Sequence, residues 1–260
     1  MSGAEAVLGL VLLEWTAGLL GAAGWTQSWS VVRRGHFRII AWCALFFAVG
    51  GYFAFRAGTQ DTDATLQRGF VIALVVIALL YLLVQYSRTD VPGAVVGLAG
   101  AAVGVLLLAV MGNLFDGWSV VASLGLVSGM FVLGAVTNGM LLGHWYLNQP
   151  GLKTWALGRI TDLALYAVIV SAAAGLIAVG RLANASTEGA VLGIPGFGES
   201  FSVVFFGAWL AILGLTGAVV WMARRCVKIK SIQSATGLFY VALLTAGVSE
   251  FLVRYLMVNA

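Results

Sequence analysis

Long apolar segments follow one another along the chain, and short runs of polar, charged or turn-forming residues separate them. A helix of roughly 20 apolar residues is long enough to cross the hydrocarbon core of a bilayer. The segments cover approximately residues 5–29, 37–55, 69–87, 93–113, 119–147, 154–180, 201–223 and 232–258. We therefore predict an all-α, polytopic membrane bundle of about eight transmembrane helices, with residues 1–260 forming one integral membrane domain.

Two connections leave alternatives open. Only NLFDG at 113–117 interrupts the apolar character between the fourth and fifth segments, so the pattern allows a range of six to nine spans. The longest connection, at 182–200, contains the apolar stretch AVLGIPGF. That stretch, at 190–197, is either a plain connecting loop or a segment that lies along the membrane surface or covers the mouth of a site.

Composition agrees with a membrane protein. The chain is 61% hydrophobic and only 9% charged, whereas soluble domains carry about 25% charged residues. This composition leaves no room for a soluble domain. The two cysteines, Cys43 and Cys226, form no CxxC motif, so no iron–sulfur or c-type haem signature is present.

Charge in the connections predicts an orientation. With eight spans, the odd-numbered connections share one side and hold most of the basic residues: Arg33, Arg34, Arg38, Arg88, Lys153, Arg224, Arg225, Lys228 and Lys230, with Arg159 just inside the sixth span. The other side holds Arg56, Arg68, Arg181 and Arg254 together with most of the acids. Basic loops stay in the cytoplasm. We therefore predict a bacterial-type cytoplasmic membrane protein with both termini outside.

Glycines at helical spacing predict close helix packing. In the fourth span they are Gly93, Gly97, Gly100 and Gly104, and in the fifth they form the pairs Gly125/Gly129 and Gly139/Gly143. Small residues on one face let neighbouring backbones approach. We expect both helices to lie in the interior of the bundle.

Ionisable residues inside spans are costly and usually face a partner, a cavity or a ligand. Glu14 lies in the first span at a depth of about 13 Å, at 1.5 Å per residue. Glu250 and Arg254 are four residues apart in the last span, a spacing that favours an ion pair on one helical face. Two acids and one guanidinium then share the outer half. They are either a catalytic proton-accepting group or a structural ion pair that pins the last helix.

A second polar group is predicted on the basic side, across the hairpin of the fifth and sixth spans. It consists of Asn138, His144, Arg159, Asp162 and Tyr166. Spacings of three and four place the last three on one face of a helix, and a short turn brings His144 near Arg159. The group either contacts a cofactor or conducts protons, or it locks the helix ends together by salt bridges and hydrogen bonds.

The chain holds only two histidines, His36 and His144, the minimum for a bis-histidine haem b. His36 stands in the basic loop RRGHFR, where a histidine beside phospholipid head groups is the simpler interpretation, so haem b is disfavoured. No metal site is expected. There is also no P-loop, HExxH or nucleophile motif, which disfavours a self-contained ATPase or hydrolase.

The last span, AGVSEFLVRYL, resembles the final helix of the membrane-anchor subunits of DMSO reductase, with Glu250 and Arg254 at matching positions. The eight-span layout with little loop material also resembles the polysulfide reductase and NrfD-like anchors. The resemblance covers about a dozen residues, and the histidine motif near the second span of the DMSO reductase anchor is absent. It implies a quinol-binding subunit without a redox centre of its own.

We therefore expect a quinone-interacting membrane anchor of a respiratory oxidoreductase. It would bind menaquinone or ubiquinone and exchange electrons with an extrinsic iron–sulfur or molybdenum-type subunit. Nucleic acid is not an expected partner, and membrane lipid is. Two alternatives remain: a proton-coupled secondary transporter that uses the same carboxylates, and a structural or assembly subunit of a membrane complex.

Overall fold

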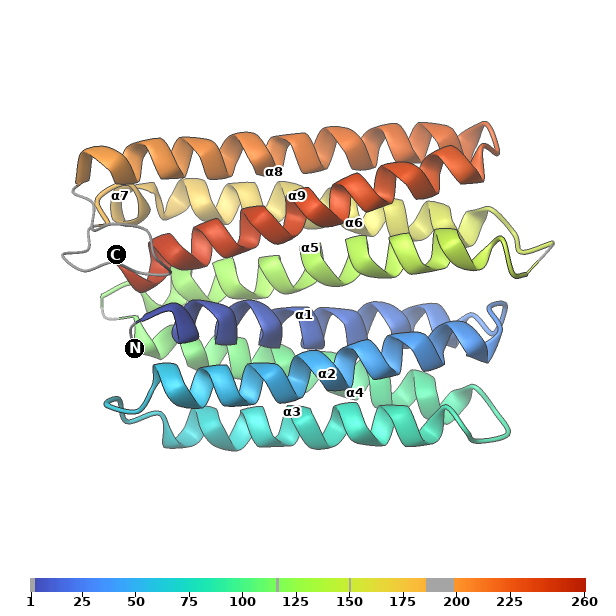
Figure 1. Ribbon diagram of the computed structural model, residues 1–260, viewed down its shortest axis with the longest axis horizontal. Coiled ribbons are helices and arrows are strands. Elements are labelled where there is room, and N and C mark those ends of the chain that lie inside the picture. Colours follow the sequence, from blue (N-terminus) through green and yellow to red (C-terminus); the bar gives the residue numbers. More distant parts are fainter. Residues whose placement is uncertain (1–2, 116, 150, 186–198) are drawn as a thin grey trace.

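The computed structural model describes residues 3–115, 117–149, 151–185 and 199–260. These residues form helices joined by short connections, with no strand among them (Figure 1). The helices are α1 (Gly3–Ser28), α2 (Arg34–Gly58), α3 (Thr65–Val84), α4 (Val91–Met111), the 3-10 turn η1 (Gly112–Leu114), α5 (Ser119–Trp145), α6 (Trp155–Ile177), α7 (Val179–Leu182), α8 (Glu199–Lys228) and α9 (Ile232–Val258).

The predicted all-α fold and its eight spans are confirmed in length and composition. Within the described residues, eight helices are long and apolar enough to cross a membrane. The indistinct boundary at 113–117 is a true break, because η1 ends α4 and Gly117 adopts a left-handed φ of 78° before α5 begins. The stretch at 190–197 lies outside the described residues, so neither interpretation of it is tested.

Among the described residues, the eight long helices form two groups of four, α1–α4 in the first and α5, α6, α8 and α9 in the second. The packing order within the first group repeats in the second. α1 packs against α2 and α4 in the first group, and α5 packs against α6 and α9 in the second. α1 and α5 run in the same direction and pack against each other, and each also contacts the last helix of the other group (Figure 1). The two groups are thus parallel copies of one arrangement, joined along α1 and α5.

The bundle interior is centred on α1, not on α4. In the most apolar stretch of α1, 78% of the residues are buried, against 61% in α5 and 39% in α4. The expectation that the glycine-rich fourth and fifth spans are both interior therefore holds for α5 alone. The α4 glycines line a single face that packs on α1, where Gly97 meets Gly24 and Gly104 meets Ala17.

The crossing of α1 and α5 depends on two glycines. A Cβ on Gly18 would overlap the backbone carbonyl of Met130, and a Cβ on Gly134 would overlap the backbone of Gly18. Because neither helix carries a side chain at this point, the two backbones touch. This close approach brings Glu14 of α1, one turn from the crossing, toward α5.

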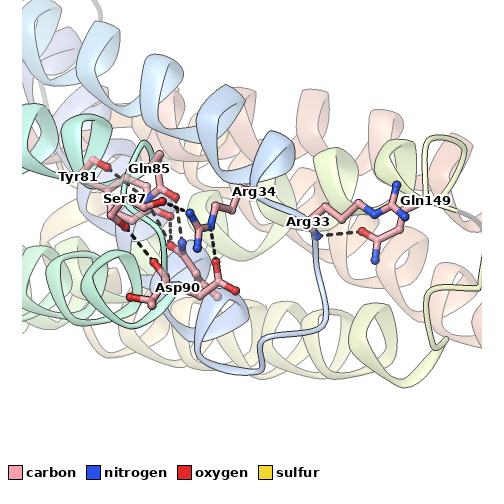
Figure 2. Close-up of polar contacts among 9 residues, drawn as sticks. Arg33, Arg34, Tyr81, Gln85, Ser87, Asp90 and Gln149 are labelled. Atoms are coloured by element: carbon pink, nitrogen blue, oxygen red, sulfur yellow. Dashed lines mark hydrogen bonds and ion pairs between the residues drawn. The ribbon is translucent and has the colours of Figure 1, made fainter.

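Both termini lie at one end of the bundle, here named the terminal end (Figure 1). The opposite end, named the basic end, is formed by the α1–α2, α3–α4, α5–α6 and α8–α9 connections. Figure 2 shows two polar contacts at the basic end, one from the start of α2 to the α3–α4 connection and one to the α5–α6 connection. Arg34 forms a 2.9 Å ion pair with Asp90 and also donates to the Ser87 carbonyl, and the Arg33 amide donates a 2.9 Å bond to Gln149 Oε1.

Candidate functional site

The outer-half carboxylates and the guanidinium predicted from sequence meet in one cluster, named here the triad. Glu14 comes from α1, and Glu250 and Arg254 come from successive turns of α9. All three side chains are buried, with exposed fractions of 0%, 0% and 1% respectively. Residues 240 positions apart in sequence are therefore joined in a part of the bundle from which lipid and solvent are excluded.

Arg254 bonds to both carboxylates of the triad. Its Nε donates a 2.6 Å hydrogen bond to Glu14 Oε1, and its Nη2 donates a 2.9 Å bond to Glu250 Oε2. The same Nη2 also donates to the Gly125 carbonyl at 2.9 Å, and Nη1 lies 2.9 Å from Met257 Sδ. The guanidinium is thus held from α1, α5 and α9 at once.

The carboxylates are less fully satisfied than the guanidinium. Glu14 Oε2 and Glu250 Oε1 both lack a hydrogen-bond partner among the described residues. Ser171 of α6 is a further polar side chain that interacts with Glu250, besides Arg254. With both acids ionised the triad has a formal charge of −1, which is costly in a buried site. One bound proton makes the triad neutral, so the arrangement is suited to accepting a proton.

Gly129 of α5 makes room for the triad. A Cβ at this position would overlap Arg254 Nη2 and Glu250 Oε2, and it would lie 2.9 Å from Glu14 Oε2. Gly129, predicted from its helical spacing to pack against another helix, packs against charged side chains. Its signal in the sequence, a small residue at helical spacing, does not distinguish these two uses.

A narrow cleft, named the terminal cleft, runs from the triad toward the terminal end between α5, α6, α8 and α9. Gly125, Ser171 and Arg254 line its deep part, and Trp118, Leu182 and Met257 line its outer part. Trp209 packs over Gly175 in its wall, and its buried indole N–H has no hydrogen-bond partner in the described structure. The cleft has room for about one water molecule.

A second concavity, named the α1–α9 groove, faces lipid beside the triad. Trp15, Tyr240, Leu243, Leu244, Gly247 and Val248 line it. Trp15 follows Glu14 directly, and Gly247 precedes Glu250 by about one turn, so the groove lies near the depth of the triad, although no triad residue lines it. Trp15 is held in place because its indole donates a 2.7 Å hydrogen bond to Thr137 of α5. Such an apolar groove suits a ligand that arrives from the bilayer.

The basic end contains a separate buried network around Asn138. Asn138 Nδ2 donates to Thr26 Oγ1 at 2.8 Å and to the Ala22 carbonyl at 3.3 Å. Its Oδ1 lies 3.2 Å from His36 Nε2. The interpretation of His36 as a loop residue beside lipid head groups is wrong, because His36 lies in the first turn of α2 and is only 1% exposed.

Three further polar side chains at the basic end were not identified from sequence. Gln27 Nε2 donates a 2.9 Å hydrogen bond to Gln85 Oε1, and the Tyr81 hydroxyl donates a 3.1 Å bond to Gln27 Oε1. All three are buried, where α1 and α3 meet. Glutamines within apolar segments are the sequence signal that would have identified this network, because polar side chains inside a span usually bond to one another.

The other predicted residues at the basic end do not form one group with Asn138. His144 is exposed, Arg159 lies over the rings of Trp29 and Trp155, and Asp162 pairs with Arg224 of α8. Tyr166 is 67% exposed on the lipid-facing side of α6. Arg159 and Asp162, which were expected to share one site, thus have separate partners on different elements.

The α5–α6 hairpin is instead held by Tyr146, which follows the last residue of α5. Its hydroxyl donates a 2.7 Å hydrogen bond to the Lys153 carbonyl and accepts a 3.4 Å bond from the Leu157 amide. Burial raises the pKa of Tyr146 to about 12. The hydroxyl therefore keeps its proton, and with it the hydrogen bond across the connection, well into the alkaline range.

Among the described residues, no three His, Cys, Asp or Glu side chains are close enough together to hold a metal ion. Comparisons with protein-family models, with curated proteins and with solved structures find no match to this chain.

Proposed function

We propose that this chain is the quinol-interacting membrane subunit of a respiratory oxidoreductase complex and that the triad receives the protons of the quinol. The observation that supports this most directly is the unequal pairing of Glu14, Glu250 and Arg254. Two wholly buried carboxylates share one guanidinium, and one oxygen of each, Glu14 Oε2 and Glu250 Oε1, has no donor among the described residues. A buried base of this kind can accept a proton from a substrate hydroxyl.

We also propose an orientation, in which the basic end faces the cytoplasm and both termini lie outside a bacterial-type cytoplasmic membrane. The basic end carries Arg33, Arg34, Arg38, Arg88, Lys153, Arg159, Arg224, Arg225, Lys228 and Lys230. Short basic connections are retained on the cytoplasmic side. The triad and the terminal cleft then belong to the outer half of the bilayer.

In the proposed reaction, a quinol enters the α1–α9 groove from the bilayer, because its isoprenoid chain is as apolar as the groove. Oxidation breaks both O–H bonds of the quinol and yields quinone, two protons and two electrons. The electrons pass to an extrinsic iron–sulfur subunit on the outer face, which is the oxidant. The protons pass to the triad and leave through the terminal cleft.

The charge of the triad sets the order of proton transfer. The first proton changes the formal charge from −1 to 0, whereas a second would leave a net positive charge buried next to Arg254. We therefore expect the first proton to leave through the terminal cleft before the triad accepts the second. Glu14 is the proposed acceptor, and Glu250 with Arg254 holds it in position.

The test is quinol-dependent turnover of the assembled complex carrying Glu14→Gln or Glu250→Gln. Each substitution leaves Arg254 paired with one remaining carboxylate, so the cluster stays near neutral and the complex is expected to assemble. Removing a general base typically lowers the rate 10²- to 10⁴-fold. We expect a loss of that order for Glu14→Gln, with electron transfer within the partner subunits unchanged when a soluble donor is used.

Glu5→Gln is the matched control, because Glu5 lies on the same helix and is exposed. It should turn over at the wild-type rate. Wild-type turnover by both Glu14→Gln and Glu250→Gln would contradict the proposal.

A proton-coupled carrier is the second candidate, favoured by the position of the triad between the two helix groups. Glu14 belongs to the first group, and Glu250 and Arg254 belong to the second. Many carriers bind substrate and coupling ions where repeated halves meet. This candidate predicts that the purified protein alone, in liposomes, moves a solute in response to a pH gradient. The quinol proposal predicts no such flux without a redox partner.

A further inference from the structure

An apolar trough lies on the lipid-facing side of the bundle opposite the α1–α9 groove, between α4 and α6. Its lining includes Trp25 of α1, Leu98 and Ala101 of α4, Phe131 of α5 and Leu163 of α6. A second hollow shares Phe131 and Leu163 with it and continues to Leu124 and Val170 toward the terminal end. The two hollows adjoin at Phe131 and Leu163 and are named together the α4–α6 trough.

Arg159 lies on α6 on the basic-end side of the trough, one turn before Leu163. Its guanidinium lies 4.5 Å from the ring centroid of Trp155 and 5.5 Å from that of Trp29. Trp29 packs in turn on Trp25, at 4.9 Å between ring centroids, which lines the trough. The aromatic rings thus connect the guanidinium to the apolar surface below it.

The positive charge of Arg159 is not neutralised within the described structure. Arg159 forms no ion pair with an acidic residue there, and the nearest acid along α6, Asp162, is paired with Arg224. A guanidinium stacked on indole rings keeps its N–H edge available for two parallel hydrogen bonds to a phosphate. Its exposed position places that edge at the membrane–water boundary.

The dimensions of the site match one leaflet. From Arg159 to Val170, α6 advances eleven residues, which is about 16 Å at 1.5 Å per residue. Half of a hydrocarbon core of about 30 Å is about 15 Å. A phosphate bound at Arg159 therefore places an attached acyl chain along the trough for the depth of a single leaflet.

We propose that Arg159 and the α4–α6 trough form a binding site for one anionic phospholipid of the leaflet at the basic end. The phosphate is bound by Arg159 above Trp29 and Trp155, and an acyl chain lies in the trough. Net negative charge is required, because the ammonium group of a zwitterionic lipid competes with Arg159 for the phosphate. Basic sites between transmembrane helices bind anionic head groups in this way. The site is independent of the triad and of quinol chemistry.

The test compares phosphatidylglycerol with phosphatidylcholine of identical acyl chains, titrated onto the purified full-length protein and followed by native mass spectrometry. Wild type should retain phosphatidylglycerol in preference to phosphatidylcholine. Arg159→Gln should reduce this preference about fivefold, which corresponds to about 1 kcal/mol for one basic residue near a membrane surface. Arg88→Gln is the matched control, since Arg88 is exposed at the same end and lies in the α3–α4 connection.

A second variant tests the trough. Leu98 is 45% exposed, so Leu98→Trp narrows the trough at its rim without entering the packed core. It should reduce retention of both lipids equally and leave the head-group preference intact. An unchanged preference in Arg159→Gln, or an equal loss in Arg88→Gln, would overturn the proposal. So would retention of a neutral isoprenoid lipid in the trough that Arg159→Gln does not affect.

Discussion

Gly129→Ala adds a single methyl group where the structure has no room for one. The new Cβ would overlap Arg254 Nη2 and Glu250 Oε2 and would approach Glu14 Oε2 to 2.9 Å. These atoms are the ends of side chains, so either Arg254 moves away from a carboxylate or α5 shifts slightly away from the cluster. Overpacking of a core typically costs 1–3 kcal/mol, and breaking a buried ion pair costs 3–5 kcal/mol.

We therefore expect Gly129→Ala to lower the free energy of unfolding by about 2–5 kcal/mol. The lower value applies if α5 shifts slightly and both ion pairs survive, and the upper value applies if one pair breaks. Equilibrium unfolding of the purified protein in mixed micelles measures the change. Quinol-dependent turnover of the assembled complex should fall as well, because Arg254 no longer holds Glu14 in place.

Gly125→Ala is the matched control, one turn earlier on the same helix. Its Cβ would lie 3.8 Å from Arg254 Nη1, an ordinary van der Waals contact, and the Gly125 carbonyl that accepts from Arg254 is kept. Replacing glycine by alanine in a helix gains up to about 1 kcal/mol. Equal stability of Gly129→Ala and Gly125→Ala would refute the proposed packing of the triad against α5.

Three further predictions concern the basic end. Asn138→Leu should lower the free energy of unfolding by about 1–3 kcal/mol in the same micelle assay, because His36 loses its buried partner; stability equal to wild type would contradict the network. Asp90→Asn should cost less than about 1 kcal/mol, since its ion pair with Arg34 is partly exposed, and the difference should shrink at high salt. Arg88→Cys, in a background without the two native cysteines, should resist a membrane-impermeant thiol reagent in intact cells and react in inverted vesicles. Reaction in intact cells would reverse the proposed orientation.

The spans and the Glu250–Arg254 pair could be predicted because both depend on local spacing. Twenty apolar residues form a spanning helix whatever surrounds them. Residues four apart on a helix share a face, and the 2.9 Å contact between Glu250 and Arg254 follows from that. These features require no knowledge of how the helices pack.

The central position of α1 and the contact of Glu14 with Arg254 could not be predicted in the same way. In a membrane, residues that face lipid and residues that face another helix are both apolar, so the hydrophobic pattern does not reveal the interior. Polar residues are the better guide, since Glu14, Thr26 and Gln27 all lie in α1 and all are buried. His36 was misplaced because its basic neighbours indicated a loop, although α2 already begins at Arg34.

The most direct test of the proposed proton acceptor is the release of protons during quinol oxidation, measured together with electron transfer. The complex is reconstituted into vesicles with the terminal end outside, and a pH-sensitive dye is placed outside or within them. The proposal predicts that wild type releases protons into the outer medium in step with electron transfer, and that Glu14→Gln loses both while Glu5→Gln keeps both. Proton release into the vesicle interior, or undiminished outward release by Glu14→Gln, would contradict the assignment of the triad as the proton acceptor.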